Sequence, residues 1–449
     1  MIRIITIRSQ LIINMKKIHY RIVIYAILAV SLGFIFPPNG LFSEFDETSI
    51  NPDLNATEAP DHIMLTWSDD PTTTQTISWR AKTAVAQGSV RYKESDNPRA
   101  AYITINATVE RFTTLPGDTP GSMNIFSARL TGLKPGTRYI YSIESGKNSS
   151  TEKSFFTAVK NNDTFEFLIF GDSQCGDARN PDYAPWHDTV NGAFKRHGNS
   201  KFIINMGDLV EVGQSYIHWD NWFNAAKDVI SSVPVVPVQG NHETYTKVRR
   251  EHSKPIYYTG QFKVFQNGPN GLKGQVYSFD YGTIHFSVLD SQQDEESPIS
   301  GDILQVQKEW LDRDLASSKK PWKLVLMHKP PYYNNPMSIN TSVKAAFCPI
   351  FDKHHVDVVF TAHDHVIART IPMKNDKPYS NPKDGTVYYI TGRSGAKHYD
   401  FLFSMPWDEF FHNPRKEPCY LLVSVNKNRL TIAIYNQDGS DINSYSIVK

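Results

Sequence analysis

The chain has 449 residues, more than one ordinary hydrophobic core accommodates, which predicts two domains with short tails. Hydrophobic residues make up 40% and charged residues 21% of it, values typical of a globular protein. The formal net charge is +1, so no global field indicates a nucleic acid or a membrane surface as a specific partner.

Residues 1–36 are basic and then apolar. Basic residues without any acid occupy positions 3–21, and an almost wholly apolar run follows from Ile22 to Phe36. This run is typical of a secretory signal, because a bilayer-spanning helix needs roughly 20 residues. A cleaved signal peptide and an uncleaved N-terminal anchor, which would tether the protein to a membrane, both stay open. Either one predicts a secreted or otherwise extracytoplasmic protein, with residues 37–59 as a linker.

Residues 60–157 are predicted to form a small all-β sandwich. Short β-type runs such as Gln75–Trp79 are separated by segments rich in turn residues. A Pro-Gly turn precedes the alternating Tyr139 and Tyr141, a pattern that resembles the corner of fibronectin type III domains. The segment contains no cysteine, which excludes the disulfide-pinned immunoglobulin form.

From residue 158 to 449, apolar strand-like runs alternate with helical patterns, which predicts an α/β domain. A helix is expected over Asp302–Ser317, because apolar residues recur there near helical spacing. The three cysteines of the chain are too few and too scattered for a disulfide scaffold or a zinc ribbon.

Five apolar runs in this second domain end in residue types that ligate metals. Ligands bind outside the carboxyl ends of strands in α/β sheets, so side chains just beyond several strands converge on one crevice. Glycine precedes three of these residues, where a strand must turn sharply and let a cation approach the backbone. Each motif alone also fits a turn or a strand cap, but their coincidence favours a site. The residues are Asp172, Asp208, Asn241, His328, His363 and His365.

The residue types of this set indicate which metals it would hold. Imidazole nitrogens with carboxylate oxygens suit zinc, manganese or iron, and the absence of cysteine argues against a structural zinc site. Two divalent cations would outweigh the charge of two carboxylates, so the centre would stay electropositive and open to phosphate oxygens. We therefore expect two divalent metal ions, Mn, Zn or Fe.

The order Asp, Gly-Asp, Gly-Asn-His-Glu, His and His-x-His resembles the calcineurin-like metallophosphoesterase superfamily, and the preceding sandwich resembles that of its purple acid phosphatase branch. The resemblance covers nearly everything beyond about residue 60. It implies a four-layer α/β/β/α metallophosphoesterase sandwich behind a fibronectin type III-like domain. It also implies acid phosphatase-like hydrolysis of phosphate esters, with a metal-activated hydroxide as nucleophile.

The resemblance further implies a role for each matching residue. His242 is expected beside the leaving group or the phosphate, and Glu243 is expected to orient it. Arg393, in a glycine-rich strand end, would meet phosphate, with a surface arginine as the alternative. The implied ligand assignment has Asp208 bridging two metals, the first held also by Asp172 and His365 and the second by Asn241, His328 and His363.

The sequence departs from the family pattern at several positions. Glu211 stands where purple enzymes carry an iron-binding tyrosine, which predicts a weaker preference for ferric iron; Glu211 is either a ligand or a solvated carboxylate nearby. At Gln174 the wider superfamily has a histidine, and we predict that the glutamine oxygen replaces that ligand. Asp364, which lies between His363 and His365, is expected to point away from the metals or to lie just behind their ligands. Plant-type purple acid phosphatases carry a substrate-contacting histidine pair after the position of His328, and this chain has none there. Neither an acid pH optimum nor a preference for phosphate monoesters is therefore expected from the resemblance alone.

Two alternatives to a phosphatase stay open. The same metal pair would serve a phosphodiesterase or a nucleotide pyrophosphatase, so the expected partner is a phosphorylated small molecule or a nucleotide. The second alternative is a non-catalytic surface binding protein with a structural metal site, against which the complete ligand set argues. The sequence does not predict the oligomeric state.

Overall fold

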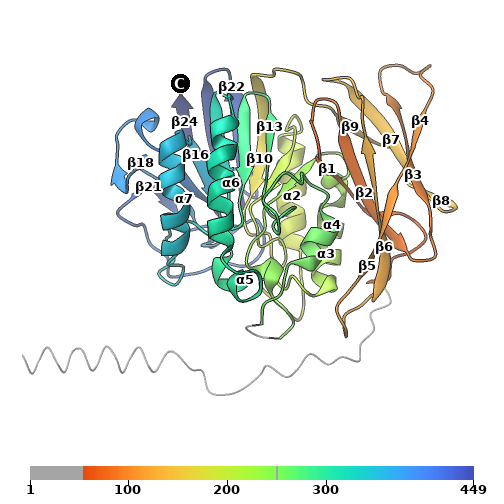
Figure 1. Ribbon diagram of the computed structural model, residues 1–449, viewed down its shortest axis with the longest axis horizontal. Coiled ribbons are helices and arrows are strands. Elements are labelled where there is room, and N and C mark those ends of the chain that lie inside the picture. Colours follow the sequence, from red (N-terminus) through yellow and green to blue (C-terminus); the bar gives the residue numbers. More distant parts are fainter. Residues whose placement is uncertain (1–53, 249–250) are drawn as a thin grey trace, which may run out of the picture. The chain divides into compact units, whose positions relative to one another are not determined.

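The computed structural model describes residues 54–248 and 251–449. The predicted leader and most of the predicted linker lie outside these residues, so their interpretation stays a prediction. Figure 1 shows a part built from strands alone, β1 to β9, followed by an α/β part that contains β10 to β24. Within the described ranges, no helix is both long and apolar enough to cross a membrane.

The N-terminal part is an all-β sandwich, as predicted. One sheet has the order β1-β2-β6-β5 and the other β4-β3-β7-β8, with β9 paired to β7. Tyr139 Oη accepts a hydrogen bond from the backbone N–H of Lys134 over 2.9 Å, which ties the predicted Pro-Gly turn to the following strand. The strands are Asp61–Thr66 (β1), Gln75–Lys82 (β2), Gly88–Glu94 (β3), Ile103–Asn106 (β4), Thr108–Thr113 (β5), Ser122–Leu130 (β6), Arg138–Ser145 (β7), Asn148–Ser149 (β8) and Lys153–Phe156 (β9).

The α/β part contains two large sheets. The first has the order β12-β11-β10-β22-β23-β24, and the second has the order β13-β14-β15-β16-β20-β17-β21. β10, β11 and β12 are parallel in the first sheet, and β14, β15, β16 and β20 are parallel in the second. The strands are Thr164–Phe170 (β10), Ile203–Asn205 (β11), Val235–Pro237 (β12), Tyr277–Tyr281 (β13), Ile284–Val288 (β14), Trp322–Leu326 (β15), Val358–Thr361 (β16), Ile367–Thr370 (β17), Met373–Lys374 (β18), Lys377–Pro378 (β19), Val387–Thr391 (β20), Asp408–His412 (β21), Cys419–Asn426 (β22), Arg429–Asn436 (β23) and Asp441–Val448 (β24).

Helices cover the outer faces of the two sheets. α6 and α7 lie over the second sheet in Figure 1, while α2 packs on α3 and contacts β22 of the first. Asp302 caps α6 by accepting the backbone N–H of Gln305, which confirms the helix predicted from spacing. The helices are Ala184–Arg196 (α2), Tyr216–Ile230 (α3), His242–Thr244 (η2), Ile256–Gln261 (α4), Gln293–Ser300 (α5), Ile303–Ser317 (α6), Thr341–His354 (α7) and Pro382–Asp384 (η3).

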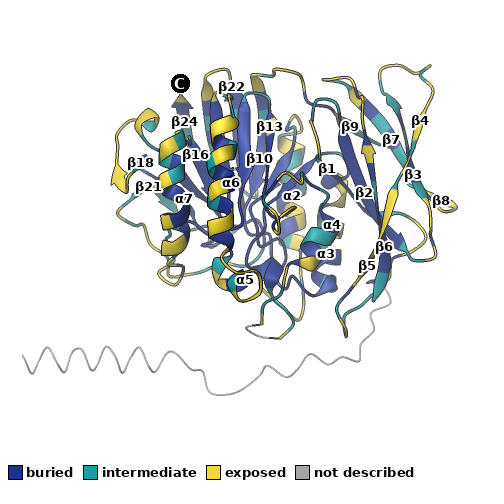
Figure 2. Ribbon diagram, viewed as in Figure 1, coloured by how far each residue is buried: buried dark blue, intermediate teal, exposed yellow. Residues whose placement is uncertain are grey.

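Strand alternation explains why the architecture has four layers. In β15, Leu324 and Leu326 belong to the core between the two sheets, whereas Val325 belongs to the core beneath α6 and α7. Figure 2 shows the same division, with dark blue strands inside and yellow outer faces on α6 and α7. The α/β/β/α arrangement implied by the sequence is confirmed.

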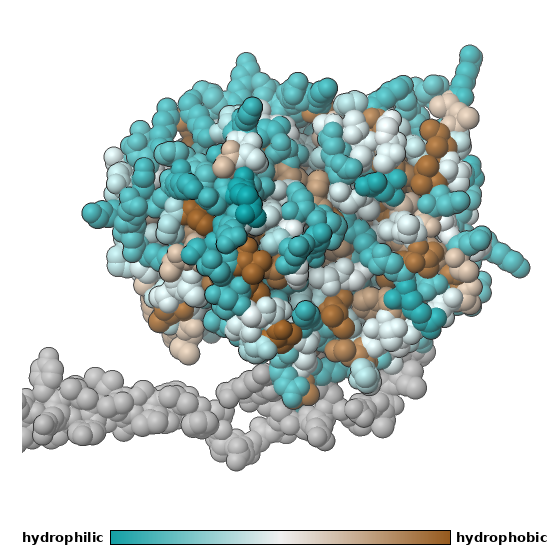
Figure 3. Space-filling model, viewed as in Figure 1, coloured by the Kyte–Doolittle hydropathy of each residue, from teal (hydrophilic) through white to brown (hydrophobic). Residues whose placement is uncertain are grey.

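The sandwich and the α/β part share a buried interface. Arg80 Nη2 lies 2.7 Å from Asp220 Oδ1 of α3, while its Nε lies 2.6 Å from Asp61 Oδ1. His62 Nε2 lies 3.1 Å from the same Asp220 oxygen. Past the other end of β1, Trp67 packs edge-on against Phe202. On the face in Figure 3, brown apolar side chains form separate small groups on a largely teal and white surface.

Candidate metal centre

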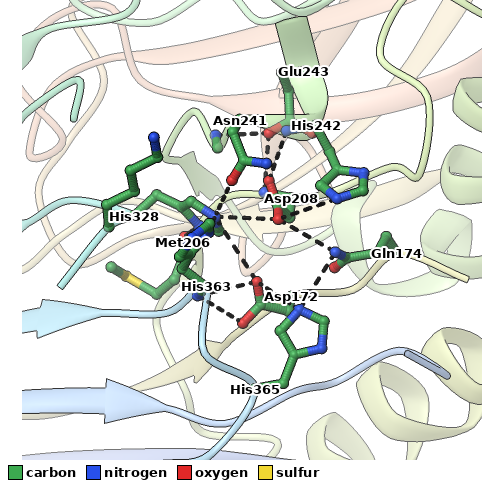
Figure 4. Close-up of polar contacts among 12 residues, drawn as sticks. Asp172, Gln174, Met206, Asp208, Asn241, His242, Glu243, His328, His363 and His365 are labelled. Carbon is green, nitrogen blue, oxygen red and sulfur yellow. Dashed lines mark hydrogen bonds and ion pairs between the residues drawn. The ribbon is translucent and has the colours of Figure 1, made fainter. Parts of the chain in front are cut away.

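The six predicted ligands gather at the carboxyl ends of five strands. Asp172, Asp208 and Asn241 follow the parallel strands β10, β11 and β12 of the first sheet. His328 follows β15 of the second sheet, and His363 follows its neighbour β16. Figure 4 shows these side chains pointing toward one another, so both sheets contribute to one centre.

Asp208 belongs to two overlapping groups of donor atoms. The first group is Asp208, His328 and His363, and the second is Asp172, Asp208 and His365. Within each group, one ligand atom of every residue lies within 4.8 Å of the others. His328 Nε2 is 3.1 Å from Asp208 Oδ2, and His365 Nε2 is 3.5 Å from Asp172 Oδ1. This arrangement offers two cation positions with one carboxylate between them.

Hydrogen bonds on the far side of each ring aim the histidine nitrogens. His328 Nδ1 donates to the Met206 carbonyl and His365 Nδ1 donates to the Lys397 carbonyl, each over 2.8 Å. These bonds leave both Nε2 atoms facing the carboxylates, where the lone pair of a neutral ring would be available to a cation. His363 Nδ1 lies 3.2 Å from His328 Nε2, so two ring nitrogens point at the same space. Such convergence is what a cation requires.

Asn241 turns its oxygen toward the same space. Its Nδ2 donates to Tyr245 Oη over 2.7 Å, and its Oδ1 lies 3.2 Å from His328 Nε2. Because the amide nitrogen is taken by the tyrosine, the oxygen is the atom presented to the centre. Asn241 therefore has the orientation that a metal ligand needs.

The backbone around the ligands is unusually tight. Asp208 has φ +48° and the preceding Gly207 has φ +92°, both in the left-handed region. A Cβ on Gly207 would lie 2.6 Å from His328 Nδ1, and one on Gly240 would lie 2.2 Å from Asp208 N. Both positions need glycine, and local strain of this kind is typical of functional sites.

The charges of the centre fit divalent cations. Burial acts against the ionisation of Asp208, but His328 and His242 outweigh it and hold the Asp208 pKa well below its ordinary value. Burial raises the pKa of Asp172 well above its ordinary value. Burial lowers the pKa of His328, but Asp208 and Asp172 outweigh it and raise the pKa to about 9. The buried negative charge of Asp208 is thus balanced by a proton on His328, and cations would balance the same charge.

Comparisons with known proteins agree with this geometry. Residues 165–367 match the calcineurin-like phosphoesterase family, and residues 60–157 match the purple acid phosphatase N-terminal domain. The chain belongs to the calcineurin-like phosphoesterases, in their purple acid phosphatase-like branch.

Individual relatives span both domains of this calcineurin-like phosphoesterase. Acid phosphatase type 7 of Mus musculus is 26% identical over 373 residues, which cover 75% of this chain and 78% of that protein. The probable inactive purple acid phosphatase 27 of Arabidopsis thaliana is 25% identical over 388 residues, which cover 76% of this chain and 61% of that protein. The purple acid phosphatase PPD1 from Lupinus luteus seeds has the same fold, with a TM-score of 0.73, 18% identity, and coverage of 87% of this chain and 74% of that one.

Glu243 does not orient His242, so that implied role is wrong. Its carboxylate accepts backbone N–H groups of Asp208 over 2.9 Å, Leu209 over 2.8 Å and Gly240 over 2.7 Å. The His242 ring instead bonds through Nδ1 to the carbonyl oxygen of Glu211, over 2.6 Å. Glu243 thus holds two ligand-bearing turns of the phosphoesterase domain together.

Arg393 is neither a phosphate ligand nor a surface arginine. The residue is 3% exposed. Its Nε donates to the Pro414 carbonyl over 3.0 Å, and its Nη1 donates to the Gly395 carbonyl over 2.7 Å. The guanidinium is therefore used to fix the loop that follows β20.

Asp364 points away from the centre as expected, accepting the backbone N–H of Asn334 over 2.6 Å.

Lys397 is a residue of the site that the sequence interpretation missed. Its Nζ lies 3.1 Å from Glu211 Oε1 and 2.9 Å from His242 Nε2. Glu211 is thus paired with the Lys397 ammonium, and it belongs to neither donor group found in the described residues. The sequence had left open whether Glu211 is a metal ligand or a solvated carboxylate nearby. The one feature of the sequence that could have indicated a role for Lys397 is its position two residues after Gly395, next to the glycine-rich stretch that begins at Gly392.

Gln174 lies beside the second donor group, as its predicted ligand role requires. Its Nε2 donates to Asp208 Oδ2 over 3.2 Å and lies 3.5 Å from His365 Nε2, while the buried Oε1 has no hydrogen-bond partner among the described residues. Rotation of the amide would present that oxygen to a cation at the same place.

Gln174→Ala is expected to lose one of the two metals and most of the turnover, because the second donor group loses an oxygen. Metal analysis of purified protein, together with a hydrolysis assay, measures both effects. Gln174→Glu keeps an oxygen donor and should retain more metal. Full metal content and turnover in Gln174→Ala would remove Gln174 from the site.

Proposed function

We propose that this chain hydrolyses phosphate esters with two divalent cations, manganese, zinc or iron. Asp208 would lie between the cations, with Asp172, Gln174 and His365 on one side. The other side would have Asn241, His328 and His363. The sharing of Asp208 between two donor groups is the observation that carries this proposal. Bound cations supply a water nucleophile at neutral pH and positive charge for the phosphate oxygens.

The chain's own residues would position the substrate. Asp208 would contribute to both cation positions, and Glu243 fixes the backbone that bears it. His242 lies on the rim of the centre, with Nε2 3.8 Å from Asp208 Oδ2, where it would face the phosphate or the leaving group. The relatives of this chain include acid phosphatase type 7 and purple acid phosphatases, and this supports an ester of phosphoric acid as the substrate.

Substrate and location are part of the same proposal. The substrate would be a phosphorylated small molecule or a nucleotide, and a phosphodiesterase or nucleotide pyrophosphatase would use the same cation pair. The basic and then apolar segment of residues 1–36 supports an exported protein. A membrane tether follows if that segment stays attached.

Removal and return of metal tests this function. The chelated protein should be inactive, and loading with manganese, zinc or iron should restore hydrolysis of at least one substrate class. The panel includes p-nitrophenyl phosphate, its diester and nucleoside triphosphates, so that it separates monoesterase, diesterase and pyrophosphatase activities. If the protein binds metal yet cleaves no ester with any of the three, the surface binding protein with a structural metal becomes the better interpretation.

A further inference from the structure

A lysine ammonium lies at the rim of the metal centre. Lys397 Nζ donates to His242 Nε2 over 2.9 Å, and that ring nitrogen is 3.8 Å from Asp208 Oδ2. The Lys397 side chain keeps 20% of its surface exposed, so it can be reached from solvent. The Lys397 side chain thus contacts the rim of the centre and is also partly open to solvent.

The hydrogen bonds of Lys397 leave a donor available. An ammonium has three N–H donors, and the described partners, His242 Nε2 and Glu211 Oε1, account for two. Glu211 is itself fixed, because its Oε2 accepts the backbone N–H of Gly176 over 3.0 Å. The lysine is thus held in place with one N–H left for an anionic ligand.

The neighbouring cationic side chains are committed elsewhere. Arg393 donates to main-chain carbonyls of its own loop. Lys329 follows His328, but its Nζ lies 2.9 Å and 2.7 Å from the two carboxylate oxygens of Glu295. Of these three cations in the described chain, Lys397 alone contacts a residue on the rim and keeps an unassigned donor.

We infer that Lys397 contacts the phosphate group of the substrate directly, donating its third N–H to a phosphoryl oxygen while Glu211 and His242 hold the ammonium in place. This role rests on the proposed function, because it assumes a phosphate ester between the cations and the rim. It makes Lys397 a substrate-binding residue and Glu211 a positioning residue. The Lys397 carbonyl has a separate task, since it accepts His365 Nδ1.

The test measures binding of inorganic phosphate to the full-length, manganese-loaded protein by titration calorimetry, without turnover. Lys397→Met should weaken phosphate binding about tenfold or more, since a hydrogen bond from a charged donor is lost. Lys397→Arg should lie nearer wild type, and Glu211→Gln, which keeps an oxygen acceptor for the ammonium but loses the charge that holds it, should bind phosphate more weakly than wild type and more tightly than Lys397→Met. Lys227→Met, on the exposed face of α3, removes the same charge elsewhere and should change nothing.

Metal analysis accompanies each titration. Lys397→Met should keep both metals, because the carbonyl that bonds His365 is unchanged. Phosphate binding as tight as in wild type, loss of metal from Lys397→Met, or no phosphate binding by wild type would each overturn the contact. If wild type binds phosphate through Lys397 but hydrolyses no ester, the inference stands and the proposed hydrolysis fails.

Discussion

Asp208→Asn is expected to abolish ester hydrolysis and to deplete both metal positions. The substitution removes the one carboxylate that both donor groups share, together with its negative charge. Asparagine tolerates the left-handed backbone that Asp208 adopts, at φ +48°, so the fold should be kept. Loss of a partner that merely orients a metal ligand costs about 10–100-fold in affinity or activity, and loss of a shared ligand should cost at least that.

Metal content and turnover on the best ester of the panel measure the effect of Asp208→Asn. Asp228→Asn on α3 is the matched control, because it makes the same chemical change on an exposed side chain. Its metal content, turnover and melting temperature should equal those of wild type. An Asp208→Asn protein that keeps both metals and full turnover would mean that the chemistry happens elsewhere.

The sequence predicted the ligand set because each ligand follows a buried strand. Parallel strands such as β10 and β11 bring their carboxyl ends to one edge, so Asp172 and Asp208 must be neighbours if both runs are strands. Gly207 and Gly240 marked the turns where the chain passes too close to another residue for a side chain. Strand identity and glycine position therefore sufficed to predict that these side chains gather in one place.

The supporting contacts could not be predicted in the same way. Glu243 accepts N–H groups from a turn more than thirty residues earlier in the sequence, and Arg393 donates to carbonyls of its own loop and of residues 414–415. Backbone donors and acceptors carry no residue-specific signal, since every residue other than proline offers both. Lys397 shows the same limit, because its partner Glu211 lies 186 residues away.

Glu243→Ala should be the most destabilising of these single substitutions. The carboxylate is fully buried and accepts backbone N–H groups of Asp208, Leu209 and Gly240, with Val210 at 3.3 Å. Alanine leaves these donors buried without an acceptor, and each unsatisfied buried donor typically costs about 1–3 kcal/mol. The turns that bear Asp208 and Asn241 would then separate, so metal should be lost as well.

Urea unfolding of the metal-free proteins separates this structural effect from metal binding. Glu309→Ala, on the exposed face of α6, is the control and should leave the unfolding midpoint unchanged. Glu243→Gln keeps one acceptor oxygen but places an amide N–H against backbone donors, so its stability should lie between alanine and wild type. Because Glu243 contacts backbone and not the His242 ring, the metal-free Glu243→Ala protein must already be less stable. A loss of activity at unchanged metal-free stability would instead return Glu243 to the role of orienting His242.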